Sequence, residues 1–76
     1  MAQVNYYVIR QAGEWKIKCL DQHFGPYKSQ KDAIKQAIDV AQKAGEKGYG
    51  AQVHIQGVDN KFRLEWTYGK DAAPSG

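Results

Sequence analysis

The chain has 76 residues, 42% of them hydrophobic and 25% charged, so it has room for one small globular domain and lacks the composition of a disordered chain. The net charge of +3 comes without a dense basic block, which argues against a dedicated nucleic-acid-binding protein. The single cysteine, Cys19, excludes an internal disulfide framework, and no apolar run approaches the roughly 18 residues of a membrane span. We therefore expect a cytoplasmic domain over residues 1–69 that carries no signal peptide and binds no membrane.

The first part of the chain predicts a β-hairpin. Residues 4–10 are rich in β-branched and aromatic types, which favour a strand. Residues 14–20 alternate between apolar and charged or polar side chains and predict a second strand. Gly13 supplies the positive φ that a tight connecting turn needs. The residues expected on the apolar face of the second strand are Trp15, Ile17 and Cys19.

One amphipathic helix follows. We expect residues 21–28, with the breaker pair Gly25-Pro26, to form a loop. Ser29 is the predicted N-cap, and Asp32 three residues later suits both a capping box and the helix dipole. Gly45 is the expected C′ residue. The apolar residues at helical spacing are Ala33, Ile34, Ala37, Ile38, Ala41 and Ala44.

The last part of the chain predicts a second hairpin. Residues 51–56 alternate again, and residues 57–60 form a turn in which Asn60 can accept positive φ. Residues 61–68 are the last predicted strand, and residues 70–76 predict a polar, flexible tail. In that strand Phe62, Leu64 and Trp66 are expected to face the core.

Two β-hairpins flanking one α-helix, in the order β-β-α-β-β, predict an α+β fold with a single, mainly antiparallel sheet packed on the helix. The strand at 4–10 has apolar residues on both faces, so we expect it to be covered on both sides, with a partner as one way of covering it. The predicted core is Val8, Trp15, Ile17, Cys19, Ile34, Ala37, Ile38, Ala41, Val53, Ile55, Phe62, Leu64 and Trp66.

The order of these motifs resembles a bacterial family, domain of unknown function 2188 (DUF2188). The resemblance covers roughly residues 5–74. The matching pieces include Val8-Ile9, Trp15-Lys16-Ile17-Lys18, Ser29-Gln30-Lys31-Asp32-Ala33-Ile34, Gln56-Gly57-Val58-Asp59-Asn60 and Thr67-Tyr68-Gly69. Two positions depart from the pattern: Gln56 replaces a histidine, and Asn60 replaces a glycine. The resemblance implies a fold and a bacterial origin, but no activity and no functional residues.

No catalytic residue, metal ligand or cofactor is expected. The alternation of side chains along residues 14–20 places Cys19 on the buried face, where an apolar environment makes a thiol inert. His23 and His54 lie far apart in the sequence, with no ligand spacing near either. The carboxylates show no paired spacing for acid–base chemistry. We therefore expect no enzyme, since a catalytic site would need a cleft that joins His23, Asp21 and Tyr27.

The most suggestive surface is the sheet face turned away from the helix, which we call the outer face. Its candidate binding residues are Tyr7, Lys16, Lys18, His54 and Arg63. Three interpretations stay open: a solvated face, a contact surface for a second copy or another protein, and a weak nucleic-acid site that uses aromatic and basic side chains. We expect a non-enzymatic interaction protein that self-associates as a homodimer, with nucleic-acid binding as the alternative.

Overall fold

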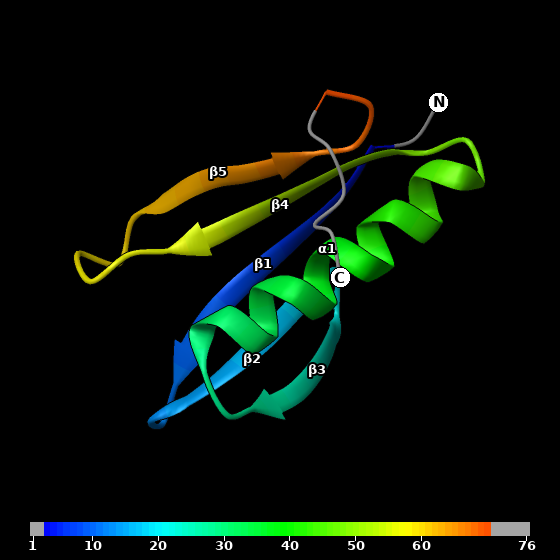
Figure 1. Cartoon of the computed structure of the whole chain (residues 1–76). Coiled ribbons are helices and arrows are strands. Elements are labelled where there is room, and N and C mark those ends of the chain that lie inside the picture. The colour runs from blue at the N-terminus through cyan, green and yellow to red at the C-terminus, as the bar shows by residue number, and fades with distance from the viewer. Residues whose placement is uncertain (1–2, 71–76) are drawn as a thin grey trace.

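The computed structural model describes residues 3–70, and in that range the chain forms a five-stranded sheet with one α-helix on one face (Figure 1). The elements are β1 (Gln3–Gln11), β2 (Glu14–Cys19), β3 (Gln22–Tyr27), α1 (Gln30–Glu46), β4 (Gly50–Gln56) and β5 (Phe62–Thr67). The predicted α+β class is confirmed. Residues 71–76, which make up most of the predicted tail, lie outside the described residues.

The strand β3 corrects the prediction of a loop at residues 21–28. It pairs antiparallel with β2, and Lys18 lies opposite His23. The register then shifts, so that Gly25 and Pro26 together lie opposite Lys16. Proline has no N–H for the ladder and is tolerated at sheet edges and bulges. β3 is an edge strand with such an irregularity, so the breaker pair did not prevent strand pairing.

The sheet is mixed, with strand order β3-β2-β1-β4-β5. β1 and β4 run parallel, with Tyr6 beside Val53 and Val8 beside Ile55, while the other neighbouring pairs are antiparallel. The prediction of two separate hairpins missed this parallel pairing and the third strand before the helix. β1 is the central strand, and within the described residues α1 covers only one of its two apolar faces, so the expected cover of the second face is not found in the chain itself.

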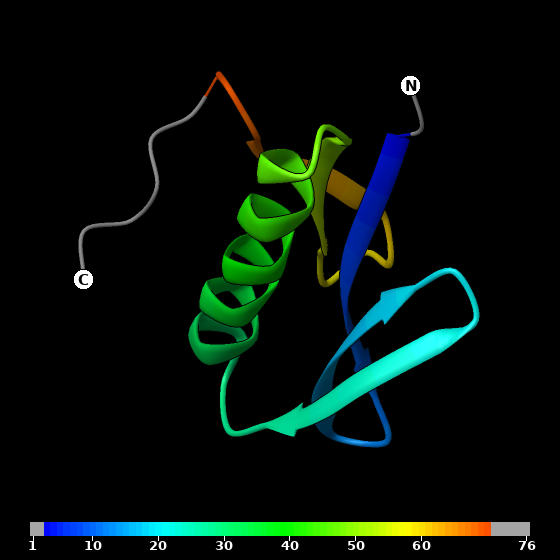
Figure 2. The ribbon, with the colours of Figure 1, turned by 90° about the vertical axis from the view of Figure 1, so that its right-hand side faces the viewer.

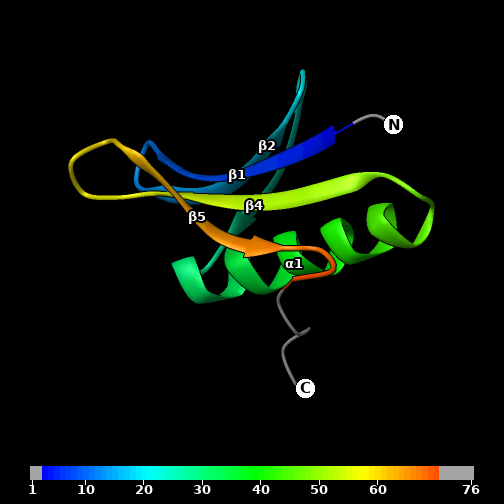
Figure 3. The same ribbon diagram turned by 90° about the horizontal axis from the view of Figure 1, so that it is seen from above.

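The sheet has two distinct sides. Figure 2 shows α1 on one side and the turn between β2 and β3 reaching out on the other, and the view from above agrees (Figure 3). We call the side that packs on α1 the inner face. The opposite side is the outer face of the sequence analysis, and within the described residues no element covers it.

The core lies between the inner face and α1. Its buried residues are Tyr6, Val8, Ile17, Ala33, Ala37, Ile38, Ala41, Ala51, Val53 and Trp66. Ala33, Ala37 and Ala41 are fully buried, because small side chains let the helix approach the sheet closely. Of the other predicted core residues, Trp15, Cys19, Ile34 and Ile55 are partly buried and pack against this cluster.

Phe62 and Leu64 are the two predicted core residues that the structure places elsewhere. Trp66 pairs with Val53 and points into the core, but Leu64 pairs with His54, which leaves Glu65 without a partner in the ladder. Such a bulge reverses the face on which the preceding residues lie. Phe62 and Leu64 are therefore on the outer face, 46% and 54% exposed.

The helix begins as predicted and ends later. The Ser29 hydroxyl accepts a hydrogen bond of 3.1 Å from the Asp32 N–H, which confirms the N-cap. Gly45 lies inside α1, and Lys47 is the C-cap, followed by Gly48 with φ +99°. Gly48 thus takes the C′ position expected for Gly45. No helix within residues 3–70 combines the length and the apolar character needed to cross a lipid bilayer.

Candidate binding face on the outer side of the sheet

Four of the five predicted binding residues do lie together on the outer face. Tyr7 on β1 lies between Lys18 on β2 and His54 on β4, its cross-strand partners. Lys16 lies opposite Ile9, one pair further along the β1–β2 ladder. Because cross-strand partners share a face, the three central strands bring these side chains to one surface.

Arg63 is the exception, and its predicted placement on the outer face is wrong. It lies opposite Ile55, an inner-face residue, and lines a cavity together with Gln30 and Ile34 of α1. The bulge at Glu65 is the cause, since simple alternation back from Trp66 assigns Arg63 to the outer face. Because of the bulge, the outer face carries Phe62 and Leu64 in place of Arg63.

An aromatic cluster forms the centre of the outer face. The rings of Tyr7 and His54 stack, with centroids 4.9 Å apart and planes at 18°. Phe62 meets Tyr7 edge-on, at 5.2 Å and 77°. The amide oxygen of Asn5 accepts hydrogen bonds from His54 Nε2 and Gln3 Nε2, both at 3.3 Å. These contacts hold the rings in defined orientations instead of leaving them free in solvent.

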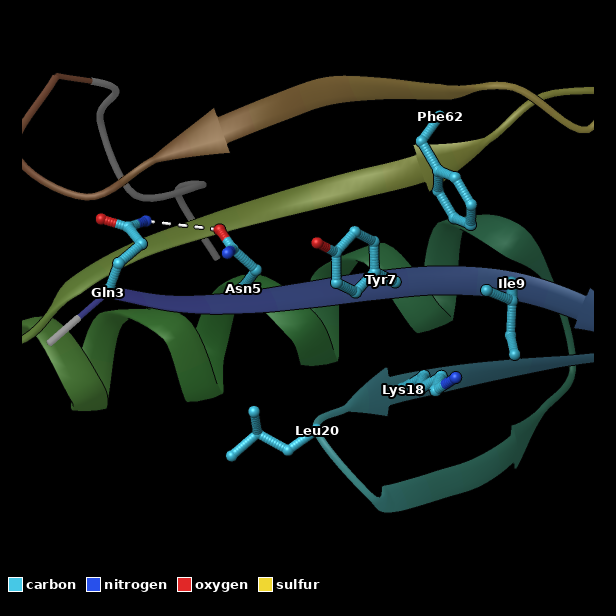
Figure 4. A pocket seen from close by; sticks show the side chains of 7 residues that line it. All are labelled: Gln3, Asn5, Tyr7, Ile9, Lys18, Leu20 and Phe62. Carbon is cyan, nitrogen blue, oxygen red and sulfur yellow. Dashed lines mark hydrogen bonds between the residues drawn. The ribbon is translucent and has the colours of Figure 1, made fainter.

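A groove of about 350 Å³ runs along β1 beside this cluster (Figure 4). Outward-facing side chains of β1 form its floor, with Leu20 on one side and Phe62 on the other. Leu20 is 84% exposed and adopts φ +56° in the turn between β2 and β3. A bulky residue rarely adopts positive φ, and such strain persists only where its surroundings impose it. The groove therefore has an exposed leucine on its rim and a mixed lining, apolar at Tyr7, Ile9 and Phe62 and polar at Gln3, Asn5 and Lys18.

Two titratable groups on the inner face, Cys19 and Tyr6, have pKa values raised by burial. Burial raises the pKa of the Cys19 thiol, which lies on the inner face and packs against the core. Burial, and to a smaller extent Cys19, also raise the pKa of the Tyr6 hydroxyl. Both shifts disfavour the reactive anion at neutral pH, in accordance with the prediction of a thiol of low reactivity.

The three residues considered for catalysis do not all lie together, because Asp21 and His23 are at one end of β3 and Tyr27 is at the other. His23 lies opposite Lys18 near the start of β3, whereas Tyr27 lies opposite Trp15 at its end. Four residues of strand correspond to about 13 Å. Among residues 3–70, no three His, Cys, Asp or Glu side chains come close enough together to hold a metal ion.

Sequence reasoning missed Leu20, Phe62 and Leu64 as outer-face residues. Leu20 occupies a two-residue turn that exists only because β3 pairs with β2. Its position on the outer face could therefore be predicted only if β3 was first recognised as a strand. Phe62 and Leu64 depend on the bulge, and no glycine or proline marks that bulge in the sequence.

Comparison with known proteins supports the resemblance noted in the sequence. No curated protein and no solved structure shows significant similarity to the chain. A family model described as an uncharacterized protein conserved in bacteria (DUF2188) matches residues 6–68, from β1 to just beyond β5. This match spans most of the chain, and the protein therefore belongs to the DUF2188 family.

Proposed function

We propose that this protein is a non-enzymatic interaction domain that self-associates through its outer face. The observation that carries the proposal is the bulge at Glu65, which turns Phe62 outward against Tyr7 and pairs Leu64 with the outer-face residue His54. Apolar surface that gathers on one uncovered face typically marks a contact site, whereas scattered exposed residues do not.

A second copy fits the outer face in size and in shape. The two longer dimensions of the protein, 34 and 28 Å, leave room for the roughly 800 Å² that each partner buries in a standard interface. The same face carries both a groove and, on its rim, the projecting side chain of Leu20. In a two-fold dimer the patch must complement itself, so the leucine of each copy can enter the groove of the other.

Charge supports the same arrangement. Lys18 lines the groove, and Asp21 follows Leu20 in the exposed turn. Within the described residues neither side chain makes an ion pair in its own chain. When Leu20 enters the partner's groove, Asp21 comes near the partner's Lys18 and its carboxylate meets an unpaired ammonium group.

Sedimentation velocity at micromolar concentrations tests the proposal. We expect a concentration-dependent dimer that Leu20→Asp and Phe62→Ser each weaken at least tenfold. Val58→Ser is the matched control, because Val58 is a fully exposed apolar residue in the turn before β5 and does not line the groove. A wild-type chain that stays monomeric at 100 µM (an order-of-magnitude concentration for a weak interface) contradicts the proposal.

A charge exchange tests the orientation of the two copies. Lys18→Glu alone and Asp21→Lys alone place like charges together and should weaken the dimer. The double variant restores the attraction with the signs reversed and should recover most of the association. If the double variant is as weak as the single variants added together, the two side chains do not meet across the interface.

Nucleic-acid binding remains the alternative proposal. Lys16, Lys18 and Tyr7 support it, but Arg63 lies on the inner face and Phe62 and Leu64 make the outer face more apolar. Titration of labelled single-stranded and duplex DNA and RNA at two salt concentrations separates the two functions. Phosphate contacts produce an affinity that falls steeply with salt, whereas an apolar dimer contact changes little.

A further inference from the structure

A second site lies on the helix side of the sheet. The sequence contains two arginines, Arg10 near the end of β1 and Arg63 in β5, and both line the same cavity of about 500 Å³. They lie far apart in the sequence, but only β4 lies between β1 and β5 in the sheet, and this brings the two arginines together. The bulge at Glu65 is needed as well, since it turns Arg63 to this side. We call this cavity the arginine pocket.

The wall of the arginine pocket is held by a chain of contacts. The Arg10 guanidinium lies 5.9 Å from the centroid of the Trp15 ring, within the range of a cation–π interaction. The Arg10 backbone N–H donates to Gln56 Oε1 at 3.1 Å, and Gln56 Nε2 donates to Asn60 Oδ1 at 3.4 Å. Gln56 therefore ties β1 to the turn before β5, and all four residues line the pocket.

Within residues 3–70 neither arginine forms an ion pair. The ion pair found among residues 3–70 joins Lys43 to Asp39 on the exposed side of α1. The carboxylate of Asp59 accepts a hydrogen bond of 3.1 Å from the Lys61 N–H. It also lies near Arg63, because a Cβ placed on Gly57 would be 2.9 Å from Asp59 Oδ1 and 3.2 Å from Arg63 Nη2. Two guanidinium groups with one carboxylate nearby leave an excess of positive charge at the cavity, which favours an anion.

We propose that the arginine pocket binds a small phosphate monoester. A guanidinium presents its N–H donors as a rigid fork that matches the oxygens of phosphate, and two forks carry the two positive charges that a phosphate dianion balances. A ligand with a single carboxylate would pair with only one guanidinium, and it carries half the negative charge of a phosphate dianion. The pocket volume lies within the range of small-molecule sites, and the Trp15 ring supplies an apolar wall for the organic part.

Trp15 provides the readout, because it lines the pocket whereas the second tryptophan, Trp66, is buried in the core. The full chain is titrated with inorganic phosphate and with O-phosphoserine at constant ionic strength, and tryptophan fluorescence and the arginine Nε–H NMR signals are followed. We expect saturable changes with both ligands, and none with serine or with sodium chloride alone. Linear changes that do not saturate overturn the proposal.

Variants assign the effect to the pocket. Arg10→Gln and Arg63→Gln should each weaken phosphate binding about tenfold or more, because each loses a charge-assisted pair of hydrogen bonds. Arg10→Lys keeps the charge and loses the fork, so it should bind more weakly than the wild type and more tightly than Arg10→Gln. Lys47→Gln removes the same charge at the exposed C-cap of α1, outside the arginine pocket, and should leave binding unchanged. If Lys47→Gln weakens binding as much as the arginine variants, net charge alone explains it and the pocket is not the site.

The arginine pocket and the proposed dimer contact lie on opposite faces, so the two proposals can fail separately. The three arginine variants change exposed side chains and should fold like the wild type, which thermal unfolding checks directly. A phosphate effect that disappears in Leu20→Asp but persists in Arg63→Gln overturns the assignment to the arginine pocket.

Discussion

The rings of Tyr7 and His54 stack across the parallel pair β1–β4, with centroids 4.9 Å apart. The pair lies on the outer face, where Phe62 closes against Tyr7 and Asn5 accepts a hydrogen bond from the imidazole. This cluster orders a surface that the helix does not cover. It also links the central strands to β5 and therefore contributes to both stability and the proposed contact.

Removing the Tyr7 ring should weaken the fold and the dimer together. Tyr7→Ala loses two aromatic contacts, each worth about 0.5–1.5 kcal/mol beyond the buried area. Tyr7→Phe keeps the ring and should stay within about 0.5 kcal/mol of the wild type, since Tyr7 has no hydroxyl contact in the described structure. Urea unfolding of the two variants compares them. Equal stability of Tyr7→Ala and Tyr7→Phe means that the stacked ring contributes nothing.

Leu20→Asn should have opposite effects on the stability of the monomer and on the strength of dimerisation. Its φ of +56° is unfavourable for a branched side chain and tolerated by asparagine. Leu20→Asn should therefore leave the monomer as stable as the wild type or raise its unfolding free energy by up to about 1 kcal/mol. The same change removes the exposed apolar group and should weaken dimerisation. Thermal unfolding at low concentration and sedimentation at high concentration measure the two effects, and a loss of monomer stability contradicts the prediction.

Gly45→Ala should not give the gain in stability that a glycine-to-alanine change usually gives in a helix. Alanine typically stabilises a helix by about 0.5–1 kcal/mol relative to glycine. At Gly45, however, the position of an added Cβ is occupied by the ring of Tyr68, which also packs edge-on against Trp66 at 6.2 Å. Gly45→Ala should therefore destabilise the wild type by about 1–3 kcal/mol through overpacking.

The Tyr68→Ala background supplies the control for Gly45. Once the ring is gone, Gly45→Ala should stabilise the helix as it does elsewhere. Urea denaturation of the four variants forms a double-mutant cycle. The same effect of Gly45→Ala in both backgrounds means that the Tyr68 ring does not restrict this position.

The thiol of Cys19 makes stability dependent on alkaline pH. Burial raises its pKa above the ordinary value of 9.0, so the folded state holds this proton at a pH where the unfolded chain loses it. The stabilising contribution is complete below pH 9.0 and is lost as the pH rises through the higher folded pKa. Tyr6 adds an effect of the same sign above its ordinary value of 10.0.

Denaturant unfolding between pH 7 and pH 10.5 checks this sign, since the range brackets the reference pKa values of cysteine and tyrosine. Cys19→Ser, which does not titrate there, should show a shallower decline than the wild type. Alkylation of Cys19 by iodoacetamide at pH 8, about one unit below the ordinary thiol value of 9.0, should be slower in the folded protein than in urea. A folded thiol that reacts as fast as the unfolded one contradicts the inward, protected placement.

Local patterns were sufficient for much of the fold. Ser29 and the alanine spacing that follows it placed the start and the buried face of α1, because caps and periodicity depend on neighbouring residues alone. Strict alternation placed Ile17 and Val53 inward and Lys16, Lys18 and His54 outward, and the ladders agree.

By itself, then, the sequence determined the α+β class, the helix, most of the core and four of the five outer-face residues, since each depends on short-range periodicity. The tertiary structure decided what requires a partner strand: the pairing of β3 despite Gly25-Pro26, the parallel alignment of β1 with β4, and the unpaired Glu65. One extra residue in β5 moves Phe62 and Leu64 outward and brings Arg63 to Arg10. Register belongs to two strands at once, and for that reason both proposed sites emerged only from the folded chain.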